Sequence, residues 1–258
     1  MRGRFQHLAG LVRAAGPMGA ARVMVGRVAG HEAVTVRCGA REMRVRPRDS
    51  DAHALAQIFG MGDYAVPEAR RRRLRRIARE WRAEGAVPLI VDGGANVGYA
   101  SLFLADLVPE ADLVAVEPGE ATYEALRANV ASEPRVTPVR GALWSHGDGV
   151  RLGEGTAGSW SASVSEGGTT PSFRLASIVE AIPNARLLIL KLDVEGAEAE
   201  VLRDAAPLLA EVPCIMVEPH DFMGEGRASL APLYEAVAGR ALDTLLVGET
   251  LMLFDGRA

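Results

Sequence analysis

The chain has 258 residues, 48% of them hydrophobic and 24% charged, which is an ordinary composition for a globular protein. It has no uncharged apolar run of about 18 residues, so the sequence predicts no transmembrane segment. Arg13 interrupts the apolar stretch Leu8–Val12, which argues against a secretory signal and favours a cytoplasmic protein. Cys38 and Cys214 are the only cysteines, and we expect two reduced thiols, with a single disulfide as the alternative.

Residues 1–84 are predicted to form a small N-terminal cap of helices and one hairpin. Residues 1–30 suggest one or two short helices. Residues 33–37 and 42–46 alternate in hydrophobicity on either side of a glycine turn, which predicts a β-hairpin. A short helix over 51–59 ends at glycines, and an arginine-rich helix follows, from Pro67 to about Glu84.

The positive charge of the chain is concentrated in this cap. Residues 1–80 hold 17 Arg against 7 Asp and Glu, a net charge of +10, so residues 81–258 carry −14 of the total of −4. The densest group lies on the arginine-rich helix and comprises Arg70, Arg71, Arg72, Arg73, Arg75 and Arg76. We interpret this face as a solvated surface, with contact to anionic lipid, nucleic acid or a polyanionic substrate as the alternative.

Residues 85–258 alternate short apolar strands with helices of roughly 10–15 residues, the pattern of a parallel sheet with right-handed crossovers. We therefore predict an α/β fold with a doubly wound, mostly parallel, Rossmann-like sheet and a C-terminal antiparallel hairpin. The predicted strands are 87–91, 113–116, 136–139, 187–192, 214–217, 244–247 and 251–254. The predicted helices are 97–107, 122–130, 198–209 and 230–237. The polar stretch 147–172 is interpreted as a short hairpin with an active-site loop.

A glycine-rich turn follows the first of these strands: Val91-Asp92-Gly93-Gly94-Ala95-Asn96-Val97-Gly98. Small residues let the backbone approach a nucleotide-type ligand closely at this point. Gly94 permits a tight turn, Asn96 tolerates a left-handed conformation, and Gly98 is expected to let the next helix pack close to the sheet. The carboxylate of Asp92 would repel a pyrophosphate, but it suits the ammonium group of a methionine-type ligand.

Two further strand ends fit the same ligand. Glu117-Pro118 ends the second strand, about 20 residues beyond the glycine turn, and a carboxylate there can accept hydrogen bonds from both ribose hydroxyls. Gly141-Ala142 ends the third strand, where small residues would leave room for an adenine ring.

Acidic residues follow the fourth strand in the segment Lys191–Glu198. Asp193 lies where a methyl donor would point, and its carboxylate could take the proton of a substrate hydroxyl. Lys191 is the only lysine of the chain and is predicted to orient the nucleophile or stabilise charge. Helix capping by Asp193 or Glu195 is the alternative.

The fifth strand is followed by Glu218-Pro219-His220-Asp221. His220 is our second candidate for the base, after Asp193, or a substrate contact. Together with Asp193, the side chains of Glu218, His220 and Asp221 could hold Mg²⁺ or another divalent ion. Because no spacing here is diagnostic, we assign no metal ligands.

In combination, the 92–98 turn, Glu117-Pro118 and the Lys191–Glu198 segment with Val201-Leu202 after it resemble the FkbM family of methyltransferases. The resemblance runs from about Asp49 to Glu218 and includes the upstream pattern Asp51, Gln57-Ile58-Phe59 and Tyr64. It implies a class I methyltransferase fold, S-adenosylmethionine as cofactor, and O-methylation of a sugar, glycan or natural-product hydroxyl by direct displacement.

The resemblance also implies site residues. Those that match the family's cofactor motif are Asp92, Gly94, Asn96, Gly98 and Glu117, to which we add Ala95, Pro118, Ala142 and Asp193. Asp193 and Glu195 match its late acidic motif. Such sequences often carry Leu-Asp before the helix that precedes the fourth strand, whereas this chain has Leu175-Ala176.

Two other functions stay as alternatives. A nicotinamide-dependent enzyme is disfavoured because the glycine triplet of dinucleotide folds is absent. A non-catalytic module that binds membrane or nucleic acid through the arginine helix would give salt-sensitive binding without cofactor affinity. As partners we expect a small-molecule or glycan acceptor and no nucleic acid, with homo-oligomer contacts through the terminal hairpin or the N-terminal helices.

Overall fold

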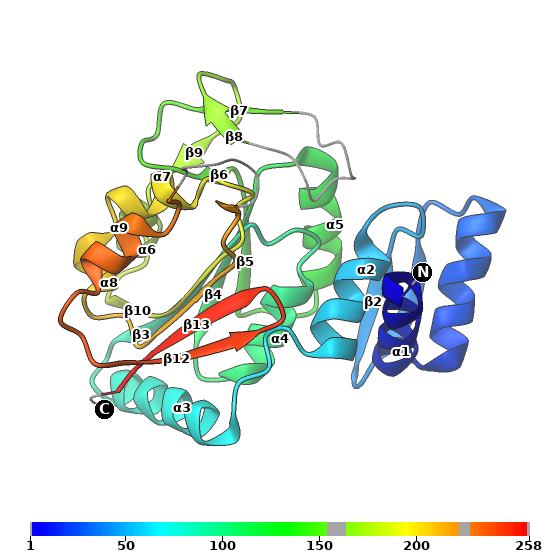
Figure 1. Cartoon of the computed structure of the whole chain (residues 1–258), viewed down its shortest axis with the longest axis horizontal. Helices are drawn as coiled ribbons and strands as arrows, with labels where there is room; N and C mark the ends of the chain where they lie inside the picture. Colours follow the sequence, from blue (N-terminus) through cyan, green and yellow to red (C-terminus); the bar gives the residue numbers. More distant parts are fainter. Residues whose placement is uncertain (1, 154–163, 222–227, 257–258) are drawn as a thin grey trace.

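The computed structural model describes residues 2–153, 164–221 and 228–256 and shows a central seven-stranded sheet with helices on both faces (Figure 1). The strands pair in parallel except the last two, β13 and β12, which are antiparallel. In spatial order they are β12 (Leu242–Val247), β13 (Thr250–Asp255), β11 (Cys214–Val217), β10 (Ala185–Leu192), β3 (Val87–Gly93), β4 (Asp112–Glu117) and β5 (Val136–Arg140). The predicted doubly wound sheet with a terminal hairpin is confirmed.

The central strands are apolar along their length because both faces of the sheet are covered. In β3, Leu89 and Val91 point into one buried cluster, and Ile90 points into the other. The cluster around Ile90 includes side chains of α3 (Glu68–Ala83), α4 (Tyr99–Leu107) and α5 (Glu120–Val130). The cluster around Leu89 and Val91 includes side chains of α6 (Leu175–Glu180), α7 (Glu198–Arg203), α8 (Ala206–Leu209) and α9 (Ala231–Ala236).

The predicted helix over 198–209 is wrong in one respect, because the structure divides it into α7 and α8. Pro207 lies in the first turn of α8. A proline in a helix interior removes a backbone hydrogen bond and clashes with the preceding turn, so the chain ends α7 and starts a new helix.

The direction of winding reverses between β3 and β10. From β3 the chain adds β4 and β5 on one side, whereas β10 and β11 lie on the other. In open α/β sheets, ligands bind beyond the carboxyl ends of the strands at such a switch point. The ends of β3 and β10 therefore mark the expected site.

The first part of the chain packs beside this sheet. It comprises α1 (Arg2–Ala29), the hairpin of β1 (Val34–Cys38) and β2 (Arg41–Val45), α2 (Asp51–Leu55), a π-helix, η1 (Ala56–Met61), and α3. The predicted hairpin is confirmed. Arg41 pairs with Asp106 and Glu133, and the hydroxyl of Tyr99 donates a hydrogen bond to the carbonyl of Arg44. One buried cluster runs from α1 to β13, and the domain boundary at residue 84 stays a prediction.

Four of the eight arginines of α3 contact the rest of the protein. Arg70 pairs with Asp243, and Arg75 donates hydrogen bonds to the carbonyls of Asp106 and Leu107. Further pairs are Arg71 with Glu68, Arg76 with Glu80, Arg79 with Glu110, and Arg82 with Asp112. The contacts of Arg70, Arg75, Arg79 and Arg82 fix α3 against the body of the molecule, whereas Arg71 and Arg76 pair within the helix.

Short strands lie between β5 and β10. β6 (Ala142–Leu143) pairs in parallel with β9 (Ser172–Phe173), and β7 (Val150–Leu152) pairs with β8 (Val164–Glu166) as an antiparallel hairpin. The hairpin predicted within 147–172 is confirmed, whereas most of its expected active-site loop, 154–163, lies outside the described residues. Cys38 and Cys214 are both free and buried. Within the described part of the chain, no helix has the length and hydrophobicity of a membrane span.

Candidate active site

The glycine-rich turn after β3 contacts the segment that follows β10. Gly94 has a φ of 72° and Asn96 a φ of 49°, so both adopt the left-handed conformation predicted for this turn. A Cβ atom on Gly94 would lie 1.7 Å from the carbonyl oxygen of Asp193. Glycine is thus required both by the conformation and by the close approach of the two segments.

Gly98 serves a different contact from the one expected. It has a φ of 87° and precedes α4 directly. A Cβ atom there would lie 2.7 Å from Leu126 Cδ1 and 3.1 Å from Val130 Cγ1, both on α5. Gly98 therefore lets α4 pack close to α5 rather than to the sheet.

A first cavity, the cleft, opens beyond the ends of β3, β4 and β10. Its volume is about 70 Å³. Six of the nine predicted cofactor residues line it: Gly94, Asn96, Glu117, Pro118, Ala142 and Asp193. The rest of the lining consists of Val116, Leu143, Val164, Val194, Glu195 and Ala197. Of the other predicted cofactor residues, Ala95 lines only the second cavity described below, and Asp92 and Gly98 line neither.

Glu117 is the most buried of the three carboxylates that line the cleft. Its Oε2 accepts a hydrogen bond from the Asn96 amide at 3.0 Å, and its Oε1 accepts one from the Gly119 amide at 2.8 Å. Burial raises the pKa of Glu117 to about 7, against the opposing effect of these two amides. Among the described residues, the buried Oδ1 of Asn96 has no hydrogen-bond partner. The cleft thus combines a carboxylate with an unsatisfied acceptor, which suits a ligand rich in donors.

The side chain of Asp92 is buried beneath the glycine-rich turn and does not line the cleft. It is fully buried, Lys191 Nζ lies 2.9 Å from its Oδ1, and the Ser101 hydroxyl donates to its Oδ2 at 2.6 Å. Burial alone would lower the pKa of Lys191, but the carboxylate of Asp92 reverses this and keeps the pKa above its usual range. The geometry makes Asp92 a support of the turn, in contrast to the predicted contact with a ligand ammonium group.

Lys191 binds the backbone of the glycine-rich turn. Its ammonium group donates hydrogen bonds to the carbonyls of Gly94 at 2.8 Å and Gly93 at 3.3 Å, and it is 2% exposed. It also lies 3.7 Å from Asp193 Oδ2. Lys191 therefore ties β10 to the glycine-rich turn, and we class it as a positioning residue.

A second cavity of about 400 Å³ meets the cleft on the other side of the turn. Both cavities share Gly94, Asn96, Asp193 and Glu195 in their lining. The second cavity is completed by residues that sequence reasoning missed, among them His7, His53, Asp63, Tyr99 and Glu249. Tyr64, which belongs to the resembling N-terminal pattern, also lines it, but nothing in the local sequence marks the others.

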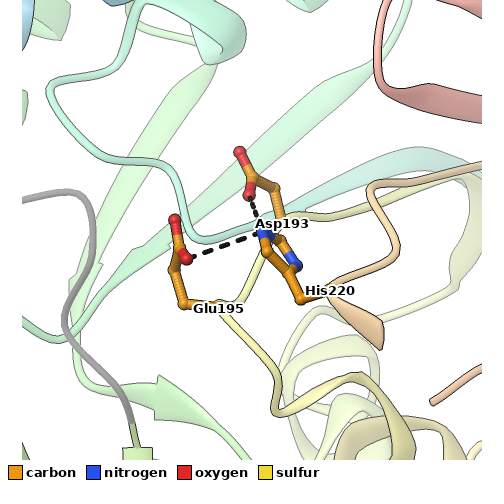
Figure 2. Close-up of side chains that lie close together, drawn as sticks. All are labelled: Asp193, Glu195 and His220. Atoms are coloured by element: carbon orange, nitrogen blue, oxygen red, sulfur yellow. Dashed lines mark ion pairs between the residues drawn. The ribbon is translucent and has the colours of Figure 1, made fainter. Parts of the chain in front are cut away.

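Asp193, Glu195 and His220 form the junction of the two cavities, and Figure 2 shows both carboxylates approaching the same nitrogen of the imidazole. His220 Nε2 lies 3.7 Å from Asp193 Oδ1 and 3.5 Å from Glu195 Oε2. Each residue offers one ligand atom, and these atoms lie within 4.8 Å of one another, so a divalent cation could be held here. Of the residues predicted as possible ligands, Glu218 lies at the edge, 3.9 Å from His220 Nε2, and Asp221 accepts from the Ser229 amide instead.

Glu198 holds the imidazole of His220. His220 Nδ1 lies 2.6 Å from Glu198 Oε1, and both side chains are buried. Burial lowers the pKa of His220, but the hydrogen bond to Glu198 outweighs it and the pKa rises to about 9. At neutral pH His220 is therefore mostly protonated and already holds its proton, which leaves Asp193 as the better candidate base. Sequence reasoning missed this role of Glu198, although the residue closes the acidic motif.

Two further carboxyl groups at the junction, those of Glu195 and Glu218, have raised pKa values. Burial raises the pKa of Glu195 to about 7 and, together with Asp193, that of Glu218 to about 8. Glu195 also has a φ of 51°, which places it in the left-handed region. The junction is therefore rich in carboxyl groups that can accept or give up a proton near neutral pH.

The fold and this site define the class: a doubly wound α/β domain with a ligand cleft at its switch point. A family model described as the methyltransferase FkbM domain matches residues 92–246. The chain therefore belongs to the FkbM methyltransferase family, as the sequence resemblance predicts.

Individual relatives are more distant. "Methyltransferase sdnD" of Sordaria araneosa is 38% identical over 53 residues, which is 20% of either chain. The FkbM methyltransferase structure from Methylobacillus flagellatus is 14% identical, with a TM-score of 0.44, over 65% of this chain and 43% of that chain. The O-methyltransferase TomG from Streptomyces achromogenes, solved with SAM, is 18% identical, with a TM-score of 0.42, over 78% of this chain and 86% of that one. The chain thus spans about a fifth of sdnD and less than half of the FkbM structure.

Proposed function

We propose that this protein is an S-adenosylmethionine-dependent O-methyltransferase that acts on a hydroxyl group of a sugar, glycan or natural product. One observation carries the proposal. The cleft that contains Glu117 meets a second cavity of about 400 Å³ at Asp193. Such an arrangement suits a methyl donor on one side and an acceptor on the other, and membership of the FkbM methyltransferase family supports it.

The cleft residues fit the donor. Glu117 keeps acceptor capacity beyond its two amide hydrogen bonds, so it can receive both ribose hydroxyls. Pro118, Ala142 and Leu143 provide apolar wall for an adenine ring, and Asn96 offers its unpaired Oδ1 near the turn. When bound, S-adenosylmethionine supplies an electrophilic methyl group.

Asp193 is proposed to accept the proton of the acceptor hydroxyl as the methyl group is transferred by direct displacement. It lines both cavities, so an acceptor in the second cavity can reach its carboxylate. Lys191 and His220 lie 3.7 Å from its two oxygens and keep the carboxylate in place. Alignment of the two reactants supplies a large part of the rate, and the base adds roughly 10²–10⁴-fold.

We assign the Asp193–Glu195–His220 cluster to the acceptor hydroxyl and not to a metal ion. Glu198 holds Nδ1 of His220 and raises the pKa of the imidazole to about 9, so a cation at Nε2 would have to displace a proton. Methyl transfer is therefore expected to persist in EDTA. We further propose that the protein works in the cytoplasm, where its two free, buried cysteines stay reduced.

The first test is calorimetry of S-adenosylmethionine and S-adenosylhomocysteine binding. Wild type is expected to bind with micromolar affinity, and Glu117→Ala to lose roughly 1.5–3 kcal/mol per hydrogen bond to the charged group. Glu120→Ala is the matched control, because Glu120 is a carboxylate three residues on, with an exposed side chain paired to Arg140. Absence of binding to folded wild type would overturn the proposal, whereas binding would justify a screen of sugar and natural-product acceptors.

A further inference from the structure

The exposed large hydrophobic side chains of the protein gather on one helix. Of the nine such side chains among the described residues, six lie on α1. They range from 37% to 88% exposed and are Leu8, Val12, Met18, Met24, Val25 and Val28. Scattered single hydrophobic residues are normal on a surface, but a contiguous group marks an interaction site.

The second half of α1, residues 17–29, carries most of this surface. A kink at Gly16, with φ 69° and ψ 170°, followed by Pro17, separates it from the first half. Figure 1 shows this half at the outer edge of the molecule, far from the central sheet. Thirteen helical residues span about 20 Å.

The two faces of this half are both apolar, but the protein uses only one. The inner face consists of small and buried residues, and Gly26 packs against Val34 and Pro47 of the hairpin region. On the outer face, exposed apolar residues recur at intervals of three and four along the helix: Met18, Ala21, Val25 and Val28. We call these four residues, together with Met24, the outer face of α1.

The charge around the outer face has one sign. Residues 1–31 contain five arginines and no Asp or Glu. Arg13, Arg22 and Arg27 are exposed, and the Arg22 guanidinium donates to the carbonyl of Thr35, which holds it beside the helix. An apolar face with arginine at its borders is the pattern of a helix that lies in the interface of an anionic bilayer.

Other partners fit less well. Two copies of α1 would bring arginines together without a compensating acid, which is unfavourable. A nucleic-acid surface would place arginine and aromatic residues at its centre, whereas the centre here is aliphatic. Arg70, Arg79 and Arg82 of α3 are engaged by Asp243, Glu110 and Asp112, and none of the exposed large hydrophobic side chains of the described residues lies on that helix, so it presents no comparable surface.

We propose that the outer face of α1 docks on membranes that contain anionic lipid, with the helix parallel to the bilayer surface. The proposal is independent of the methyl-transfer activity.

The test is flotation of the full chain with phosphatidylcholine vesicles, with and without phosphatidylglycerol. Wild type is expected to float only with the anionic vesicles, and less as NaCl rises from about 0.1 M to about 0.5 M. Val25→Glu/Val28→Glu is expected to weaken binding at least about tenfold. The matched control is Tyr234→Glu/Leu246→Glu, which adds the same charge at two equally exposed apolar sites elsewhere and should bind as wild type does.

Several outcomes would overturn the proposal. They are absence of wild-type binding to anionic vesicles, equal loss of binding in both double variants, and a dimer of the free protein that only Val25→Glu/Val28→Glu dissociates. Circular dichroism checks the fold of each variant. If the glutamates unfold the helix, Met18→Ser/Val28→Ser replaces them, because these two side chains are the most exposed of the face.

Discussion

The cleft and the second cavity share a wall but are built in different ways. The cleft is formed by the turn after β3, the ends of β4 and β10, and the start of β6, with one buried carboxylate, Glu117. The second cavity is assembled from α1, the α2–η1 region, the ends of β10 and β11, and the terminal hairpin, and it is lined by several acids. The proposed donor cleft is built mainly from turns that follow neighbouring strands of the sheet, whereas the proposed acceptor cavity is assembled from segments far apart in the chain.

The largest effect is expected where the two regions meet. Asp193→Asn removes the proposed base but keeps the shape of the side chain, so turnover should fall roughly 10²–10⁴-fold. Affinity for the donor, measured by calorimetry, should stay near that of wild type. Asp63→Asn, at a distant part of the second cavity, should change the KM for the acceptor more than turnover. Equal turnover in Asp193→Asn and wild type would remove Asp193 as the base.

A second prediction concerns the support beneath the cleft. Lys191→Met leaves the buried carboxylate of Asp92 without its cation, and breaking such a pair costs about 3–5 kcal/mol of unfolding free energy. Chemical denaturation measures the loss. The double variant Asp92→Asn/Lys191→Met should recover part of it, because no uncompensated charge remains. A single variant as stable as wild type would show that the pair does not hold the turn.

A third prediction concerns the glycine-rich turn. Gly94→Ala is the test variant, and Gly85→Ala is its control. Both glycines have positive φ, 72° and 82°, so both variants should lose about 1–2 kcal/mol from backbone strain. Only at Gly94 would the new Cβ meet a carbonyl oxygen, that of Asp193, so only this variant should also lose donor affinity. Thermal unfolding and calorimetry distinguish the two effects. Equal behaviour of both variants would argue against the close approach.

The smallest expected effect is a dependence of donor affinity on pH. Burial raises the pKa of Glu117 to about 7, so the carboxyl group becomes protonated and a poorer acceptor as pH falls through that value. Donor affinity should therefore decrease below pH 7, approaching about tenfold per pH unit. Glu117→Gln should bind more weakly and lack this component, which isolates Glu117 from the neighbouring acids. A wild-type profile as flat as that of the variant would contradict the assignment.

Much of the cleft was predictable because its parts are local. Gly94 and Asn96 follow a strand directly, and their left-handed conformations follow from residue type. Glu117 ends the next strand, and the carboxyl ends of parallel strands meet at one edge of a sheet. The predicted contact of Asp92 with the ligand shows the limit of this reasoning, because the partner that buries it, Lys191, comes from another strand.

Short-range spacing and residue type were enough to predict the alternating strands and helices, the family, the turn at the switch point and the acidic residues near it. The side chains that complete the second cavity, the contact of Glu198 with His220 and the uncovered apolar face of α1 became visible in the folded chain alone. Those features depend on contacts between segments far apart in the chain, and local patterns carry no information about which of two apolar helix faces another segment will bury.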